Sequence, residues 1–244
     1  MTGTPSVTPS PRTPRERVAL VHGFLANTLM LALLARRLRH HGYQTRVWGY
    51  GNMCCSILRH AERFATELRR MDADPACGRL HLVTHSMGCI IARAALGMFR
   101  PSKLGRFVML APPNRGSRVA TAAERVFGGI FRPVRELTTV PTSLVNTLPI
   151  PPGLEIGVVA AAHDLLVTPE STRPDVHHDH VTLPCMHSSL LFRRDAAELV
   201  AGFLATGSFL LPATAIPERA GDVDRSRLPA LASWSPPPGV GESS

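Results

Sequence analysis

The sequence has very little lysine, few aromatic residues and no long apolar run. Lys103 is the only lysine among the 27 basic residues, and aromatic residues make up 5% of the 244 positions. A groove that binds nucleic acid usually combines a basic stripe with aromatic side chains, whereas these arginines are scattered in ones and twos. We therefore expect no nucleic-acid partner. The formal net charge of +9 favours acidic substrates or anionic lipids instead.

Signals for export, membrane insertion and metal binding through paired cysteines are also missing. No apolar stretch approaches the roughly 18 residues needed to span a bilayer, and residues 1–17 lack the apolar centre of an export signal. The expected location is therefore the cytoplasm. The 5 cysteines include no C-x-x-C pair that would indicate a zinc ribbon or a redox site. Reduced thiols in a cytoplasmic protein are the simpler expectation.

Proline and small polar residues dominate both ends of the chain. Four prolines fall within residues 1–17, and residues 209–244 include three consecutive prolines. Segments of this composition bury too little apolar surface to offset the entropy lost on folding. We expect a disordered leader over 1–17, one ordered domain over 18–208 and a mostly disordered tail over 209–244.

Between these ends, short aliphatic runs alternate with amphipathic helical patterns. Strands are expected at 18–21, 44–48, 80–84, 107–110, 157–161 and 181–183, and helices at 29–39, 56–70, 86–99 and 195–205. This alternation predicts an α/β fold with a doubly wound, mostly parallel sheet and right-handed crossovers. Residues 115–152 interrupt the pattern as a small inserted region. This region either covers a site as a lid or packs on the sheet.

A serine lies between a predicted strand and a predicted helix in the segment H-L-V-T-H-S-M-G, residues 81–88. At such a turn the strained backbone pushes the side chain of Ser86 out of the sheet, and the helix N-terminus supplies positive potential. Gly88 is needed because a side chain there would collide with the preceding strand. The alternative is a serine that only caps the helix.

The T-H-S-M-G turn resembles the nucleophile elbow of the α/β-hydrolase superfamily, and it looks most like the bacterial lipase and esterase branch. Thr84 stands where glycine or another small residue is usual, and Cys89 stands where such lipases often have a second glycine. The bulkier threonine implies a slightly more open turn. The resemblance covers most of residues 18–208 and implies a compact α/β-hydrolase fold with Ser86 as nucleophile.

A second turn resembles the family's oxyanion turn. His22 and Gly23 follow the first predicted strand, as in the family's H-G-x motif. The resemblance implies that the amides of Phe24 and Met87 hold the oxyanion, because acyl transfer needs two preorganised donors. His85 adjoins the serine and is expected to point away from it. The alternative is that His22 and Gly23 form only a tight exit from the strand.

A serine nucleophile needs a base, and the base needs a carboxylate. His187 lies after the last predicted strand and before the closing helix, where the family carries its base. Asp164 lies in the D-L-L-V turn after the fifth strand, which resembles the turn that carries the family's acid. The chain order Ser86, Asp164, His187 is the order that the superfamily requires. The alternatives are His163, His177, His178 and His180 for the base, and Asp175 and Asp179 for the acid.

These residues predict a serine hydrolase that cleaves carboxylic esters through an acyl-enzyme intermediate. Lipid-like or acyl esters are the expected substrates. The expected partner is a small-molecule or lipid ester, with peripheral contact to a lipid surface. No cofactor is expected, because this acyl transfer uses neither a redox group nor a metal. The run H-H-D-H at 177–180 offers zinc-type ligands, but no second cluster completes a tetrahedral site.

Two alternatives to ester hydrolysis stay open. A thioesterase or an amidase would use the same fold and the same residues. The fold could also have been kept for binding alone, with an idle triad.

Overall fold

The computed structural model describes residues 15–51, 55–127 and 132–209. Most of the predicted leader and tail, at 1–14 and 210–244, therefore lies outside the described residues. The described strands form one sheet in the order β2-β1-β3-β4-β5-β6, with every neighbouring pair parallel. The strands are β1 (Arg15–Val21), β2 (Gln44–Trp48), β3 (Cys77–His85), β4 (Leu104–Leu110), β5 (Ile156–Ala161) and β6 (Asp179–Leu183).

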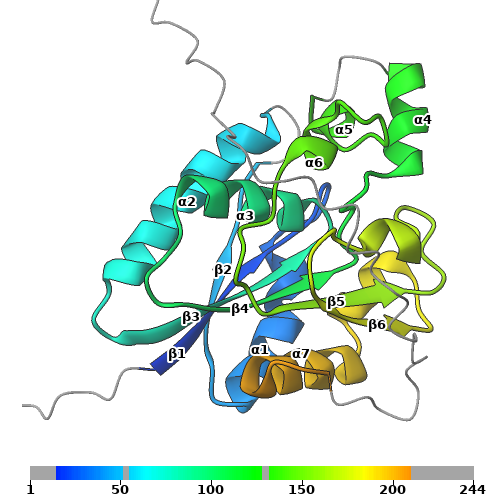
Figure 1. The fold of residues 1–244 in the computed structure, drawn as a ribbon. Coiled ribbons are helices and arrows are strands. Elements are labelled where there is room, and N and C mark those ends of the chain that lie inside the picture. The colour runs from blue at the N-terminus through cyan, green and yellow to red at the C-terminus, as the bar shows by residue number, and fades with distance from the viewer. Residues whose placement is uncertain (1–14, 52–54, 128–131, 210–244) are drawn as a thin grey trace, which may run out of the picture.

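Helices cover both faces of this sheet (Figure 1). The pair α1 (Ala32–His40) and α7 (Arg194–Thr206) lies on one face, and the pair α2 (Ile57–Ala73) and α3 (Met87–Met98) lies on the other. The predicted doubly wound α/β architecture is therefore confirmed, with all six predicted strands present. Among the described residues, no helix combines the length and apolarity that a membrane crossing requires.

The first strand begins earlier than the sequence predicts. Arg15, Glu16 and Arg17 pair with β3, although the prediction begins the strand and the ordered domain at Val18. The apolar run marks only the part of β1 that is buried, whereas the first two residues of the strand are exposed and tolerate charge. Residues 15–17 therefore belong to the sheet and not to the leader.

Alternation along the strands divides the core into two layers. Val18 and Leu20 pack with the α1 and α7 side, and Ala19 and Val21 pack with the α2 and α3 side. Successive strand residues point to opposite faces, so a parallel strand covered on both faces must be apolar throughout. This explains why the strands appear in the sequence as continuous aliphatic runs.

The inserted region between β4 and β5 forms a separate group of helices at one end of the molecule (Figure 1). Its helices are α4 (Arg118–Phe127), α5 (Arg132–Glu136) and α6 (Leu144–Thr147). Leu137 and Val145 are buried in the same apolar layer as α2 and α3. The Glu136 carboxylate accepts a hydrogen bond of 2.6 Å from the amide of Ile57, the first residue of α2. The inserted region is thus packed and hydrogen-bonded onto the α2 and α3 side.

Buried histidines predict that acid destabilises the fold. Burial lowers the pKa of His81 to about 4 and that of His180 to about 3. The unfolded chain therefore binds more protons than the folded chain below the ordinary histidine pKa of about 6.5, and the free energy of unfolding falls as pH falls from about 6.5 to about 4. Urea unfolding should show a lower midpoint at pH 5 than at pH 7.5. Equal urea midpoints at the two pH values would contradict this prediction. His40→Gln, a change at an exposed histidine, is the control and should leave the pH dependence of the midpoint unchanged.

Candidate active site

Ser86 occupies a strained turn between β3 and α3. Its φ of 53° and ψ of −127° lie in a region that residues with a side chain rarely adopt. The Ser86 amide donates a hydrogen bond of 2.9 Å to the carbonyl of Leu110 at the end of β4. Thr84, two residues earlier, is fully buried in β3 and pairs with Met109. The threonine is therefore accommodated inside the strand next to the strained turn.

Two glycines let this turn and the turn after β1 pack against each other. A Cβ atom at Gly88 would lie 2.5 Å from the carbonyl oxygen of His22 and 2.7 Å from that of Val21. A Cβ atom at Gly23 would lie 2.8 Å from the Cβ atom of Ser86. The predicted need for glycine at position 88 thus has a different cause, because the collision is with the end of β1 and not with the preceding strand β3.

Asp164 and His187 form a close, buried pair. His187 Nδ1 lies 2.6 Å from Asp164 Oδ2, and the side chains are 9% and 0% exposed respectively. The other carboxylate oxygen, Oδ1, accepts hydrogen bonds from the amides of Leu166 at 2.8 Å and Val167 at 2.9 Å. These bonds fix the carboxylate, which in turn favours the imidazole tautomer with its proton on Nδ1. The second ring nitrogen, Nε2, then has a lone pair to accept a proton.

His85, expected to point away from Ser86, lies against the ring of His187. The two ring centroids are 4.7 Å apart, and His85 Nε2 contacts the His187 carbonyl at 3.4 Å. Burial, followed by the nearby charge of His187, lowers the pKa of His85 to about 3. His85 is therefore neutral at neutral pH. Since Ser86 directly follows His85, these contacts bring the serine turn and His187 to the same end of the sheet.

The turn after β1 is held by a tyrosine that the sequence analysis missed. Tyr50 Oη donates a hydrogen bond of 2.8 Å to the His22 carbonyl, and the two rings stack with centroids 4.3 Å apart. His22 Nδ1 bonds to the Gly23 carbonyl at 2.9 Å. Burial raises the pKa of Tyr50, so its hydroxyl keeps the proton that it donates. Tyr50 follows the predicted strand 44–48, but no motif marks it.

The two nominated oxyanion donors lie in these turns. Phe24 follows Gly23, and Met87 is the first residue of α3. Within the described residues, no backbone hydrogen bond from the N–H of Phe24 or of Met87 is present. Leu25, the next residue, has a φ of 55°, so the chain leaves this turn with a second strained residue.

The alternative acids and bases make other contacts or are exposed. Asp175 pairs with Arg115 at 2.6 Å, and Asp179 accepts a hydrogen bond of 3.1 Å from the amide of Phe209. His180 Nε2 lies 2.8 Å from the Thr172 hydroxyl. Of the other candidate bases, His163 and His177 are exposed, and His178 contacts the Val176 carbonyl. In the part of the chain that the structure describes, no three His, Cys, Asp or Glu side chains are grouped to hold a metal ion.

A buried arginine connects α3 with the inserted region and with the loop after Asp164. The Arg93 guanidinium, on α3, donates to Asn114 Oδ1 at 3.0 Å and to the Leu148 carbonyl. The Asn114 amide donates to the Thr172 carbonyl at 2.7 Å. Burial lowers the pKa of Arg93 to about 10, so it stays charged at neutral pH. A single arginine in an apolar helix gives no sequence signal for this role.

Solved structures with the same arrangement of helices and strands include several lipases. A lipase of Bacillus licheniformis in its mature form is 17% identical, with a TM-score of 0.63 over 84% of this chain and 96% of that chain. Lipase B of Aspergillus fumigatus is 14% identical, with a TM-score of 0.60 over 78% of this chain and 52% of that chain. A phospholipase of Legionella pneumophila is 16% identical, with a TM-score of 0.58 over 80% of this chain and 57% of that chain.

No protein-family model matches the sequence, and no curated protein matches it. At these low identities the likeness shows a shared fold, while activity has to be argued from the side chains.

Gly88→Ala should disrupt the contact between the two turns. The added methyl group meets the backbone carbonyls of Val21 and His22, which cannot rotate away, so we expect a loss of about 2 kcal/mol in the free energy of unfolding. Gly97→Ala is the matched control, because Gly97 lies in the same helix and an added Cβ meets nothing within 4 Å. That variant should be neutral or stabilised by up to about 1 kcal/mol. Thermal and urea unfolding measure the free energy of unfolding of both variants. Equal changes in Gly88→Ala and Gly97→Ala would contradict the close approach at Gly88.

Proposed function

Because the chain has the α/β-hydrolase fold, we propose that it is a serine hydrolase that cleaves carboxylic esters, with lipid-like or acyl esters as its substrates. The observation that carries this proposal is the buried Asp164–His187 pair at the same end of the sheet as the strained turn of Ser86. A buried carboxylate on Nδ1 of a histidine and a serine at a strand-to-helix turn are two of the features that acyl transfer by a serine uses, and they support the proposal.

In the proposed reaction, Ser86 Oγ attacks the ester carbonyl while His187 Nε2 takes its proton. Asp164 keeps the imidazole in the required tautomer and stabilises its charged form. The amides of Phe24 and Met87 donate hydrogen bonds to the tetrahedral oxyanion. His187 then returns the proton to the leaving alcohol, and water repeats both steps on the acyl enzyme.

The neutral state of His85 suits this mechanism. A second positive charge at a ring distance of 4.7 Å would oppose protonation of His187. Because burial lowers the pKa of His85 to about 3, the imidazolium of His187 forms without that repulsion at neutral pH. The His85 ring therefore packs against His187 without competing for the proton that His187 takes up.

Exposed apolar side chains around the site support a lipid-like substrate. Leu25 and Leu29 follow β1 and are 69% and 78% exposed, and Leu165, after β5, is 78% exposed. Leu166 and Met186, which flank the proposed acid and base, are also exposed. All the strands are parallel, so these residues lie at the carboxyl ends of the strands, as Ser86 does. An apolar rim of this kind supports binding of an acyl chain and contact with a lipid surface.

Replacing the proposed nucleophile tests the reaction. Ser86→Ala should lower the rate of p-nitrophenyl ester hydrolysis by at least about 10³-fold and abolish labelling by a fluorophosphonate probe, because the attacking oxygen is lost. Ser208→Ala, a change at an exposed serine outside the site, is the control and should keep both. Circular dichroism checks that the fold is intact. Labelling or hydrolysis that survives in Ser86→Ala would rule out Ser86 as the nucleophile.

Shortening the apolar rim tests the substrate class. Leu29→Ser should lower kcat/KM for p-nitrophenyl dodecanoate about fivefold and leave the acetate ester unchanged, since roughly 1 kcal/mol of contact with a long acyl chain is lost. Met98→Ser is the control. Met98 is also exposed, but it is the last residue of α3 and lies toward the amino ends of the strands, away from Ser86. A parallel panel of thioesters and anilides identifies the preferred bond. An unchanged preference for chain length in Leu29→Ser would contradict acyl binding at the rim.

A further inference from the structure

A continuous groove runs along the outer edge of β2 and the outer side of α2. Three adjoining hollows form it: the first and second share Arg63 and Thr66, and the second and third share Glu67 and Arg70. The largest hollow has a volume of about 590 Å³ and includes Gln44, Thr45 and Arg46 of β2. We call this surface the β2-edge groove. Its charged lining consists of Arg17, Arg39, Arg46, Arg59, Arg63, Arg70, Glu62, Glu67 and Asp74.

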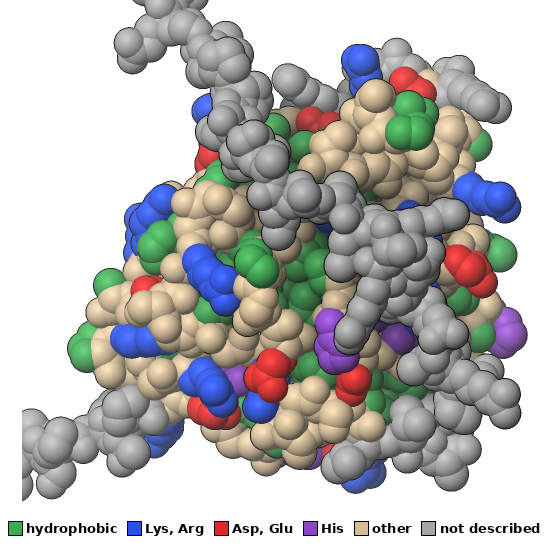
Figure 2. All heavy atoms as spheres, viewed as in Figure 1, with side chains coloured by type: hydrophobic (Ala, Val, Ile, Leu, Met, Phe, Trp, Pro, Cys, Tyr) green, Lys and Arg blue, Asp and Glu red, His purple; other side chains and the backbone are tan. Residues whose placement is uncertain are grey.

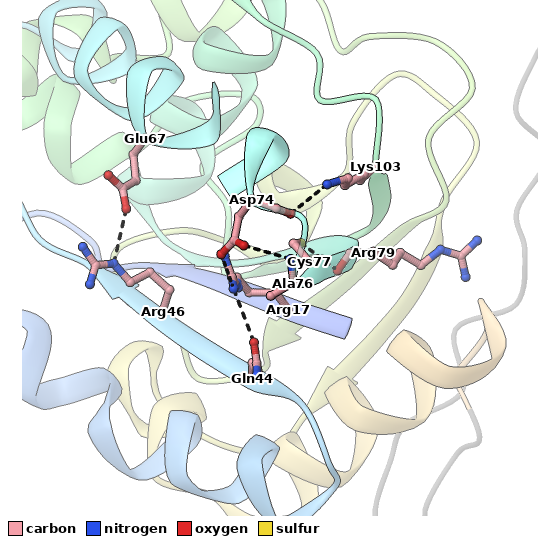
Figure 3. Close-up of polar contacts among 9 residues, drawn as sticks. All are labelled: Arg17, Gln44, Arg46, Glu67, Asp74, Ala76, Cys77, Arg79 and Lys103. Atoms are coloured by element: carbon pink, nitrogen blue, oxygen red, sulfur yellow. Dashed lines mark hydrogen bonds and ion pairs between the residues drawn. The ribbon is translucent and has the colours of Figure 1, made fainter. Parts of the chain in front are cut away.

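Arginine outnumbers carboxylate in this groove by six to three. Figure 3 shows the Arg46 guanidinium from β2 reaching Glu67 on α2, and Arg17 contacting Asp74. Arg59 and Arg63 form no ion pair with any residue that the structure describes. Figure 2 shows basic side chains over α2 at the left of the view. The groove therefore has positive charge that the described residues do not neutralise.

The groove follows the open edge of the sheet. Across the described ranges β2 pairs only with β1, so the backbone groups on its other side have no strand partner. Side chains of β2 alternate between the two faces. Thr45 accepts a hydrogen bond from Arg39 of α1 at 2.8 Å, whereas the neighbouring Arg46 contacts Glu67 of α2. A strand added at this edge would alternate in the same way and would meet arginine on both faces.

We propose that the β2-edge groove binds an extended acidic peptide segment of a partner protein, which pairs with β2 as an additional strand. Backbone hydrogen bonds to the open edge supply affinity, and the arginines select glutamate or aspartate side chains. Open backbone groups favour a peptide over a nucleic acid or a membrane, because neither of those forms a strand ladder. Arg17 and Asp74 place one end of the groove at the amino ends of the strands, opposite the end that carries Ser86. The other end, at Trp48 and Gly49, lies near the carboxyl end of β2.

The test measures binding of two acidic octapeptides with equal charge to the full chain. Fluorescein-labelled E-T-T-E-E-T-T-E can form a strand ladder, whereas E-P-P-E-E-P-P-E has proline, without a backbone donor, at every second position of each edge. Fluorescence anisotropy at low salt should show binding of the threonine peptide at least about tenfold tighter than that of the proline peptide. Equal affinities would overturn strand addition.

Protein variants locate the surface. Arg63→Gln and Arg39→Gln should each weaken binding of the threonine peptide about three- to fivefold, one from each face of the added strand. Arg118→Gln, the same charge change at an exposed arginine on α4, is the control and should bind like the parent chain. Insensitivity to Arg63 and Arg39 would overturn the proposal. The proposal would also be overturned if the chain bound phosphatidylglycerol vesicles or oligothymidylate more tightly than the threonine peptide and lost that binding in Arg63→Gln and Arg39→Gln. The groove would then bind a lipid or a nucleic acid.

Discussion

The contact between the end of β1 and the start of α3 is the constraint on which the rest of the site depends. Because Val21 and Thr84 are register partners, the turns that follow them leave the sheet side by side. Gly88 lies so close to the carbonyls of Val21 and His22 that the two turns meet backbone to backbone. Neither turn can therefore move without the other. The strained conformation of Ser86 is held by the buried elements on both sides of it, since strain of this kind persists only where surrounding packing determines it.

Contacts from three other segments help to hold the two turns in place. Tyr50 fixes the carbonyl of His22 from the end of β2, and His85 packs on His187 from the end of β3. Arg93 on α3 donates to Asn114, and the Asn114 side chain donates to the Thr172 carbonyl in the loop that follows Asp164. Each loop that carries a candidate residue is thus connected to a neighbouring loop by a buried polar contact. Polar contacts between buried groups favour one arrangement of these loops over others.

The sequence predicted the architecture well because buried parallel strands must be apolar on both faces. The same reasoning failed at Arg15 to Arg17, where the strand continues into solvent and charge is tolerated. The chain order of Ser86, Asp164 and His187 was visible because each follows a predicted strand, although their catalytic roles remain predictions. Tyr50 and Arg93 could not be found in this way, because each acts through a contact between segments far apart in the chain. The orientation of His85 depends equally on packing that no local pattern encodes.

The hydrogen bond between Glu136 and the first amide of α2 links the inserted helices to the domain in a particular way. A carboxylate at a helix N-terminus stabilises that helix by interaction with its dipole, by about 0.3–1 kcal/mol at an exposed position. Lifting the inserted region would leave the first turn of α2 without this anion. Displacement of the insert would therefore be coupled to fraying of the first turn of α2, so the stability of that helix and the position of the insert depend on each other.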